Sequence, residues 1–395
     1  MNLLFIQGGS RWKFDTEGNV YTDSNFNEQV WNRYRKYCDH LTVILRKEEK
    51  IYQPDEAKKR FNAFNIRKSS CIAIPDIYRP LKNVISLSKR NEIKKTIETE
   101  VKKADKVIIR SLGNIYTNTA LRCARKYNKP YMVEVTGFAW ESLWYHSLHG
   151  KFVAFPKELQ YRYLMKDVDF ALYVTNEALQ KRYPARGKML GCSDVELPEI
   201  SEDILAKRLK KIDEHEGRWI LGTAAFLDVG WKGQKYVIKA LKHLRDQGFD
   251  NFEYEMIGAG TGNKLKKLIT QLHMEDRIRI LGAFPHEKVF DWLDHIDVYI
   301  QSSFMEGLCR SIVEAMSRGC PVIASNVGGN YELISQDCLV KKGNVRDLAK
   351  VLRVVNAKWL IKKSKENASK SLEFKKEKLD KKRNSFYKQF FEYKL

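Results

Sequence analysis

The stretch SSFMEGLCRSIVEAMSRGCPV, residues 302–322, sets two carboxylates eight positions apart. Glu306 follows an apolar, strand-like run and precedes a glycine, whereas Glu314 lies within a helical pattern. At about 100° per residue, Glu314 falls opposite the apolar side of that helix, and Arg310 and Arg318 flank it four residues away on either side. Two interpretations stay open: an Arg–Glu–Arg ladder on a solvated face, or two acids that grip a ligand at a helix N-terminus in a cleft.

A lysine in the segment DVGWKGQKYVIKAL has a position suited to phosphate chemistry. Lys232 sits in a loop just before an amphipathic helical pattern. A lysine at such a place can neutralise a diphosphate, and an ordinary exposed loop lysine is the alternative.

Two glycine pairs follow apolar runs. We expect Gly8 and Gly9 to close the first strand in a turn, where backbone N–H groups can approach an anion, although a simple tight turn fits equally well. Gly258 and Gly260, in GAGTG, resemble a dinucleotide fingerprint but lack its full spacing and its acidic partner. The sequence therefore excludes a nicotinamide site there.

Length and composition limit the class of protein. A chain of 395 residues with 43% hydrophobic residues is long enough for two or three domains with real cores. The seven cysteines are scattered, without a C-x-x-C pair, which favours a reducing compartment and argues against a zinc site. The first residues read as a strand and not as a signal peptide, and no apolar run is long enough to span a bilayer.

Short apolar runs alternate with amphipathic helical stretches along the whole chain. This pattern predicts an α/β protein with parallel sheets, built as two doubly wound, Rossmann-like halves that bind ligands at the carboxyl ends of their strands. The join is expected near residues 194–218, which are charged and poor in β-formers. The last residues predict a helix with aromatic side chains on one side, which needs a partner surface.

The net charge of +22 is unevenly distributed. Residues 1–200 carry +12, residues 201–350 carry +1 and residues 351–395 carry +9. A one-sided excess attracts a polyanion, either nucleic acid or anionic lipid, whereas lysines on solvated helices would need no partner. Nucleic acid is not expected, because neither a recognised module nor aromatics interleaved with basic residues on exposed strands is evident.

A family resemblance rests on four segments taken in order: WKGQKYVIKAL, YEMIGAG, RIRILGAF and SSFMEGLCRSIVEAMSRGCPVIASNVGGNYELI. They resemble the donor half of the family 4 (group 1) glycosyltransferases of the GT-B fold, with their Glu, seven residues, Glu signature. The resemblance implies two Rossmann-like domains around a deep cleft. Residues 1–195 would bind the acceptor, residues 196–372 would bind the nucleotide-sugar donor, and residues 373–395 would form a helix packed back on the first domain.

The resemblance also implies roles for individual residues. Glu306 would hydrogen-bond the hydroxyls of the donor sugar, Glu314 would bind the ribose, and Lys232 would neutralise the diphosphate leaving group. Further donor contacts are expected from Gly307, Leu308, Cys309, Arg310, Gly258 and Gly260.

The reaction implied is sugar transfer from a UDP- or GDP-sugar with retention at the anomeric carbon, without a metal or another cofactor. The expected acceptor is a lipid-linked glycan in the synthesis of a capsule, O-antigen or exopolysaccharide. Together with the basic charge, this predicts a cytoplasmic enzyme held peripherally at the inner face of the cell membrane. A nucleotide-sugar epimerase on the same fold is the alternative.

The sequence departs from the family in the phosphate site. Leu227 occupies the place, five positions before Lys232, where relatives carry an arginine. Help in neutralising the phosphates is then expected from Lys235, Arg310 or Arg11.

A second departure lies in the first half. Many relatives carry a histidine after the strand that here reads YMVEV, where this sequence has Thr136 and Gly137. His146 or His149 would have to reach the site instead, or else lie on the surface. Trp140 and Trp144 could stack on an acceptor sugar or pack in the core. The predicted acceptor or phosphate loop thus comprises Gly8, Gly9, Arg11, Trp140, Trp144 and His146.

Overall fold

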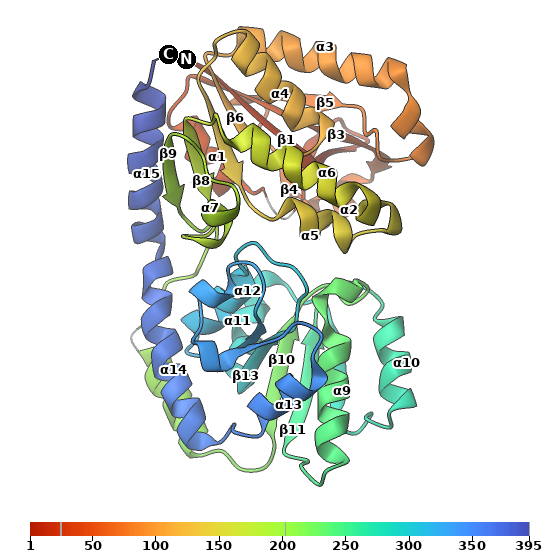
Figure 1. The fold of residues 1–395 in the computed structure, drawn as a ribbon, viewed down its shortest axis with the longest axis vertical. Coiled ribbons are helices and arrows are strands. Elements are labelled where there is room, and N and C mark those ends of the chain that lie inside the picture. Colours follow the sequence, from red (N-terminus) through yellow and green to blue (C-terminus); the bar gives the residue numbers. More distant parts are fainter. Residues whose placement is uncertain (24–25, 202, 395) are drawn as a thin grey trace.

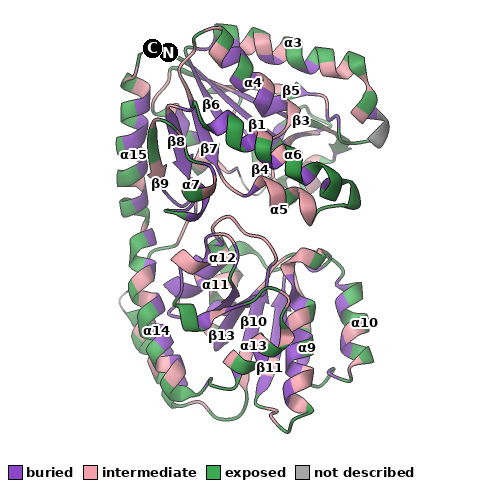
Figure 2. Cartoon of the chain, in the orientation of Figure 1, coloured by how far each residue is buried: buried purple, intermediate pink, exposed green. Residues whose placement is uncertain are grey.

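The computed structural model describes residues 1–23, 26–201 and 203–394. They form two α/β domains, one above the other, with the C-terminal helices running along one side of both (Figure 1). In each domain the strands are mostly buried and the outer faces of the helices are exposed (Figure 2). This is the two-domain GT-B architecture.

The first domain is built on a nine-stranded sheet. Its parallel strands lie in the order β5-β3-β1-β6-β7-β8-β9, and the short strands β2 and β4 add an antiparallel ribbon at the far end of β1. The strands are β1 (Asn2–Asp15), β2 (Val20–Thr22), β3 (His40–Tyr52), β4 (Asn62–Ala63), β5 (Ser69–Ile74), β6 (Lys106–Arg110), β7 (Tyr131–Val135), β8 (Phe170–Tyr173) and β9 (Lys188–Gly191). The helices are α1 (Glu28–Arg35), α2 (Pro54–Arg60), η1 (Leu81–Ile85), α3 (Leu87–Lys103), α4 (Ile115–Lys126), α5 (Ala139–Trp144), α6 (Leu148–Met165) and α7 (Ala178–Arg182).

The expected turn at Gly8 and Gly9 is wrong. Strand β1 continues through both glycines to Asp15, with a shift in its register against β3 between Ile6 and Arg11. Gly8 instead allows the side chain of Asn114 to pack closely against the backbone of β1, because a Cβ at this position would lie 2.3 Å from the side-chain oxygen of Asn114. An irregular strand thus accommodates the glycines that the sequence suggested would end it.

The second domain has a six-stranded, all-parallel sheet in the order β12-β11-β10-β13-β14-β15. Its strands are β10 (Trp219–Ala224), β11 (Phe252–Ile257), β12 (Ile278–Gly282), β13 (Val298–Gln301), β14 (Val322–Ser325) and β15 (Leu339–Val340). Its helices are α8 (Asp203–Asp213), η2 (Gly230–Lys232), α9 (Gln234–Arg245), α10 (Asn263–Gln271), α11 (His286–His295), α12 (Arg310–Ser317), η3 (Asn330–Glu332), η4 (Gln336–Cys338), α13 (Val345–Leu352) and α14 (Ala357–Ser371).

The strand order of this sheet reverses at β10. Strand β10 pairs with β11 on one side and with β13 on the other, so the chain leaves these neighbouring strands in opposite directions around the sheet. In open α/β sheets such a switch point leaves a crevice at the carboxyl ends of the strands, where ligands bind. The loops that follow β10 and β13 carry Lys232 and the stretch around Glu306.

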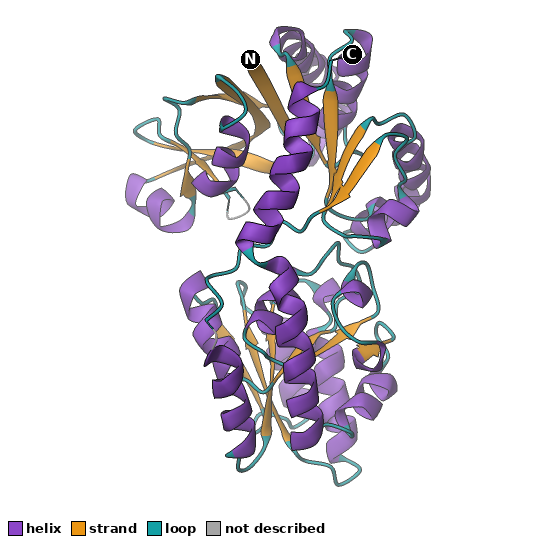
Figure 3. Cartoon of the chain, turned by 90° about the vertical axis from the view of Figure 1, so that its left-hand side faces the viewer, coloured by secondary structure: helices purple, strands orange, loops and turns teal. Residues whose placement is uncertain are grey.

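The chain returns to the first domain at its end. Helix α14 packs against α8 and α12, and after the short turn η5 (Leu372–Phe374) the helix α15 (Lys376–Glu392) lies against the first sheet (Figure 3). The aromatic side of α15 is buried: Phe386 and Phe390 pack on Phe170, and Lys106 Nζ donates a 3.0 Å hydrogen bond to the carbonyl of Phe390. The terminal helix therefore ties the two domains together.

The structure also bears on disulfide bonds and on membrane-spanning helices. All seven cysteines are free. Among the helices that the structure describes, none combines the length and apolar character that crossing a bilayer requires.

The docking of α15 predicts a stability effect. Replacing Phe390, which is fully buried, by Ala should lower the free energy of unfolding by about 3–5 kcal/mol, because the cavity lies between α15 and the sheet. Urea unfolding measures this. Lys388→Ala, on the exposed side of the same helix, is the matched control and should change stability by less than about 0.5 kcal/mol. A similar small effect for Phe390→Ala would contradict the observed packing.

Candidate active site in the interdomain cleft

An ion pair joins the two loops at the switch point of the second sheet. Lys232 Nζ, at the end of η2 after β10, lies 2.7 Å from Glu306 Oε1, in the loop after β13. The two side chains are 16% and 12% exposed, so both charges are largely removed from water. The structure thus brings together the two residues predicted to carry catalysis.

The electrostatics of Lys232 follow from this pairing. Burial, the largest single influence, would lower the pKa of Lys232, but the charge of Glu306, the hydrogen bond to it and the neighbouring Cys309 together raise the pKa above its usual value. Lys232 is therefore a cation at neutral pH and not a general base. Its ammonium also lies 4.6 Å from the ring centre of Trp231, which adds a cation–π contact.

A glutamine that sequence reasoning missed orients Glu306. The amide nitrogen of Gln301, the last residue of β13, donates to Glu306 Oε1 at 3.1 Å, while its amide oxygen accepts from the hydroxyl of Tyr299 at 2.7 Å. Gln301 is fully buried. Its only sequence signal was a polar residue at the carboxyl end of an apolar strand, which is a common place for ligand-site residues in parallel sheets.

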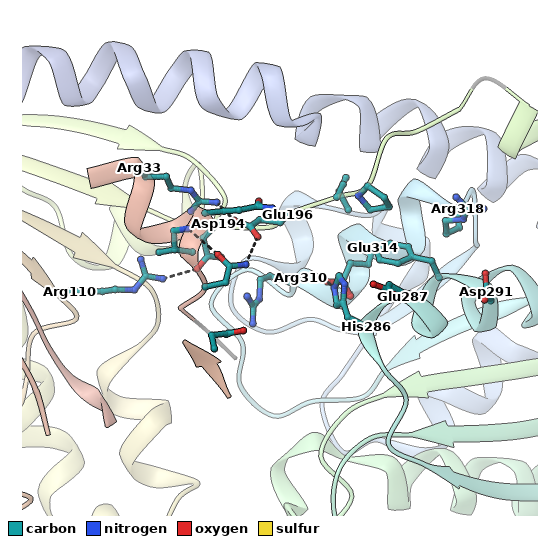
Figure 4. A pocket seen from close by; sticks show the side chains of 17 residues that line it. Arg33, Arg110, Asp194, Glu196, His286, Glu287, Asp291, Arg310, Glu314 and Arg318 are labelled. Carbon is teal, nitrogen blue, oxygen red and sulfur yellow. Dashed lines mark hydrogen bonds and ion pairs between the residues drawn. The ribbon is translucent and has the colours of Figure 1, made fainter. Parts of the chain in front are cut away.

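The second acid of the signature faces the cleft, and the Arg–Glu–Arg ladder, one of the two interpretations left open, does not form at Arg318. Glu314 lies on α12 with its Oε1 3.9 Å from Nε2 of His286. Arg318 instead pairs with Asp294, at 2.8 Å between Nε and Oδ1, because α11 packs beside α12 and offers a closer carboxylate. Arg310 turns away from the helix and lies between the two groups of side chains in the cleft (Figure 4).

The cleft beside Glu314 holds a cavity of about 860 Å³. Figure 4 shows Arg33, Arg110 and Asp194 on the side of the first domain, facing Glu314 and its neighbours from the second. Burial opposes ionisation of Asp194, but the charges of Arg110 and Arg310 hold the pKa of its carboxyl below the usual value. The cavity is therefore lined by four arginines together with acidic side chains, which suits a charged, hydroxyl-rich ligand.

The first domain anchors this wall through a buried network. Arg110 NH1 donates to Glu134 Oε2 at 2.7 Å and its NH2 donates to Asp194 Oδ2 at 2.8 Å. The hydroxyls of Tyr34 and Tyr387 also donate to Glu134, at 3.0 and 2.9 Å. Since Tyr387 belongs to α15, the C-terminal helix supports the side chains that line the cleft.

The loop after Glu306 touches the opposite domain. A Cβ at Gly307 would lie 2.3 Å from the carbonyl oxygen of Thr136, in the loop after β7, so only glycine allows this approach. Leu308 packs against the cores of both domains, and Cys309 is buried just before α12. Burial raises the pKa of the Cys309 thiol to about 12, so it is no nucleophile at neutral pH.

A second cavity of about 350 Å³ lies where Glu306 faces the first domain. Three cationic side chains line it, Lys181 and Arg182 from α7 and Lys342 from the second domain. Arg182 is held by Glu158 Oε1 at 2.7 Å and by Glu141 Oε1 at 3.0 Å. None of the three cations stood out in the sequence, because single lysines and arginines carry no local signal.

The domains also meet at the start of α7. The carboxylate of Glu332, in η3 of the second domain, accepts from the backbone N–H groups of Asn176, Glu177 and Ala178, at 2.6, 3.2 and 2.8 Å. Nearby, Phe304 contacts Tyr145 edge to face, with ring centres 5.5 Å apart. These contacts join the two domains beside the cleft.

The remaining donor-side predictions lie at the adjacent strand ends. Gly258 and Gly260 follow β11, where a Cβ on Gly258 would meet the carbonyl of Ala225 at 1.9 Å and one on Gly260 would meet Asp228 Oδ2 at 2.7 Å. They let two loops pack together. Leu227, five positions before Lys232, is buried in the core of the domain.

The predicted acceptor residues are dispersed. Arg11 pairs with Asp76, at 2.9 Å between Nε and Oδ2, and so lies in a charge network within the first domain. Trp140 and Trp144 stack on each other with ring centres 5.2 Å apart, and His146 is exposed in the turn between α5 and α6. Gly8 and Gly9 lie within β1. In the described ranges, no cluster of three or more His, Cys, Asp or Glu side chains has the geometry of a metal site.

Comparison with known proteins agrees with the fold and the cleft. The family model described as glycosyl transferases group 1 matches residues 209–371. Protein CapJ of Staphylococcus aureus is 30% identical over 368 residues, which cover 93% of this chain and 88% of that protein. The chain therefore belongs to the group 1 glycosyl transferases and has the GT-B fold.

Two further relatives are informative. The amylovoran biosynthesis glycosyltransferase AmsK of Erwinia amylovora is 34% identical over 148 residues, covering 35% of this chain and 36% of that protein. The crystal structure of HepE of Anabaena in complex with UDP-glucose has a TM-score of 0.62 and 17% identity, covering 98% of this chain and all of that one. That similarity concerns the fold.

The contact between His286 and Glu314 predicts a pH effect. The carboxylate of Glu314 raises the pKa of His286 above its usual value, while partial burial acts in the opposite direction. A raised folded-state pKa means that the contact stabilises the protein fully below the ordinary pKa, about 6.5, and that this stabilisation is lost as the pH rises through the raised value.

Glu314→Gln should therefore lower the pKa of His286, which histidine NMR titration measures. It should also destabilise the protein more at pH 6 than at pH 8. Glu287→Gln, the matched control, removes the neighbouring cleft carboxylate and should leave His286 as in the wild type. An unchanged pKa in Glu314→Gln would show that the two groups do not interact.

Proposed function

We propose that this chain is a retaining glycosyltransferase that moves a sugar from a UDP- or GDP-linked donor to a lipid-linked glycan during surface polysaccharide assembly. The observation that carries the proposal is the Lys232–Glu306 pair at the switch point of the second sheet, with Glu314 on the helix that follows. The UDP-glucose bound to HepE supports the donor class, and the name of AmsK supports the polysaccharide role.

The donor would occupy the second domain's side of the cleft. In this proposal Glu314, near the middle of α12, binds the ribose hydroxyls, and Glu306 accepts hydrogen bonds from the hydroxyls of the sugar. Lys232, which Glu306 neutralises before the donor arrives, turns its ammonium to the diphosphate, and Arg310 stands in for the arginine that Leu227 replaces. Cationic side chains would thus supply the charge that the leaving group needs, without a metal or another cofactor.

The transfer would follow a front-face course. The acceptor oxygen forms a bond to the anomeric carbon as the bond from that carbon to the diphosphate oxygen breaks. The leaving oxygen keeps the bonding electron pair, and the acceptor's proton passes to a phosphate oxygen on the same face. Lys232 and Arg310 stabilise the negative charge that develops on the diphosphate, in a site that excludes most water.

The acceptor would enter from the second cavity. Its cationic lining of Lys181, Arg182 and Lys342 suits the phosphates of a lipid diphosphate, and Glu306 lies at its inner end. A lipid-linked acceptor requires a membrane nearby, and we propose a cytoplasmic enzyme bound peripherally to the inner face of the cell membrane. The net charge of +12 on residues 1–200 supports that location.

The central test is Glu306→Gln, assayed for sugar transfer from UDP- and GDP-sugars to a lipid-linked acceptor. Turnover should fall about 100-fold or more, because the neutral amide no longer matches the charge that develops in the transition state. The fold should stay intact, which circular dichroism checks. Glu275→Gln, at an exposed acid of the second domain that lines neither cavity, is the matched control and should retain transfer.

Two outcomes would contradict the proposal. Near-normal turnover in Glu306→Gln would remove the donor site from the Lys232–Glu306 pair. Conversion of the donor to an epimer in the absence of any acceptor would favour a nucleotide-sugar epimerase on the same fold.

A further inference from the structure

Helix α6 has apolar side chains on two opposite faces. One face packs into the first domain through Ala154, Tyr161 and Met165. The opposite face is exposed, and at about 100° per residue its five large apolar side chains fall within an arc of about 80°. These residues, which we call the α6 stripe, are Leu148, Phe152, Phe155, Leu159 and Tyr163, with exposures of 74%, 85%, 58%, 50% and 66%.

A row of large apolar side chains of this kind is unusual on the surface of soluble proteins. Single exposed apolar residues are common, but a contiguous row on one helix marks an interaction site. Aromatic rings extend it, since Trp140 meets Phe155 edge to face at 6.2 Å and stacks on Trp144. The half-buried tryptophans and the exposed Tyr163 have the amphipathic rings that favour a membrane interface.

The charges around the α6 stripe are basic. Lys151 and Arg162 are exposed on the same helix and Lys166 is exposed at its C-cap, and Lys151 Nζ lies 5.6 Å from the ring centre of Trp144. Glu158, the acid within the helix, is buried and pairs with Arg162 and Arg182, so it adds little negative charge to the surface. An apolar row bordered by cations matches a bilayer with anionic headgroups.

We propose that the α6 stripe is a membrane-docking face, which lies in the plane of an anionic bilayer and inserts its apolar side chains among the headgroups. The charge of the whole chain is complementary to that surface, because residues 1–200 carry +12, the segment ending in α15 carries +9, and residues 201–350 carry +1. A second copy of the chain or a protein partner would not require this one-sided basic charge.

The position of the stripe connects it to the cleft. Helix α5 packs against α6, and Glu141 of α5 lines the cavity that Glu306 reaches. Docking through α6 would therefore hold the mouth of that cavity next to the bilayer, from which a lipid-linked acceptor would enter. Only this step rests on the proposed function; docking itself needs neither donor nor acceptor.

The test is flotation of the full chain with vesicles of phosphatidylcholine alone and of phosphatidylcholine with an equal part of phosphatidylglycerol. The wild type should bind the anionic vesicles and bind the neutral ones at least tenfold more weakly. Phe152→Ser with Leu159→Ser should lower the bound-to-free ratio on anionic vesicles at least tenfold, because two large apolar side chains leave the interface without a change in charge. Ile66→Ser, an exposed apolar residue elsewhere in the basic domain, should bind like the wild type.

Several results would overturn the inference. Equal binding of the double variant and the wild type to anionic vesicles would show that basic charge alone causes the binding and that the α6 stripe does not contribute. Equal binding of the wild type to both kinds of vesicle would exclude recognition of anionic lipid. A dimer in the wild type that the double variant loses would assign the face to a second copy of the chain. By contrast, binding of the wild type to anionic vesicles without any sugar transfer would support the docking face and contradict only the proposed reaction.

Discussion

The buried ion pair between Lys232 and Glu306 is the interaction around which the loops at the switch point of the second sheet are arranged. Two opposite charges, each less than a fifth exposed, stabilise each other, since loss of either would leave the other largely desolvated and without this partner. Bringing them together requires β10 and β13 to be neighbours, and hence the reversal of strand order at β10. The same reversal opens the crevice, so the fold positions the pair where a charged ligand can replace one partner.

The second domain alone does not complete the site. The loop of Gly307 rests on Thr136, and the wall opposite Glu314 comes from Arg33, Arg110 and Asp194 of the first domain. Helix α15 holds that wall, because Tyr387 shares Glu134 with Arg110. A C-terminal segment that packs α14 on one domain and α15 on the other thus links the stability of the fold to the geometry of the cleft.

Much of this arrangement was predictable from the sequence. Alternating apolar runs and the spacing of Glu306 and Glu314 indicated the parallel sheets and the family, because both are local patterns. The predicted turn at Gly8 was wrong, because a glycine pair in a sequence usually indicates a turn. Here the glycine makes room for Asn114, which is more than a hundred positions away in the sequence. Sequence spacing left open a pair between Arg318 and Glu314, but the partner of Arg318 is Asp294, which belongs to another helix. The cations around the second cavity and the α6 stripe could not be predicted from the sequence, because only the folded structure shows which side chains line the cavity and which are exposed.

The most direct test of this account is a crystal structure of the chain with bound UDP or GDP. The account predicts the ribose hydroxyls at Glu314 and the diphosphate at Lys232, whose ammonium would move from Glu306 toward the phosphates, with the Arg310 guanidinium beside them. A nucleotide bound wholly on the first domain's side of the cleft, with the Lys232–Glu306 pair intact, would contradict it.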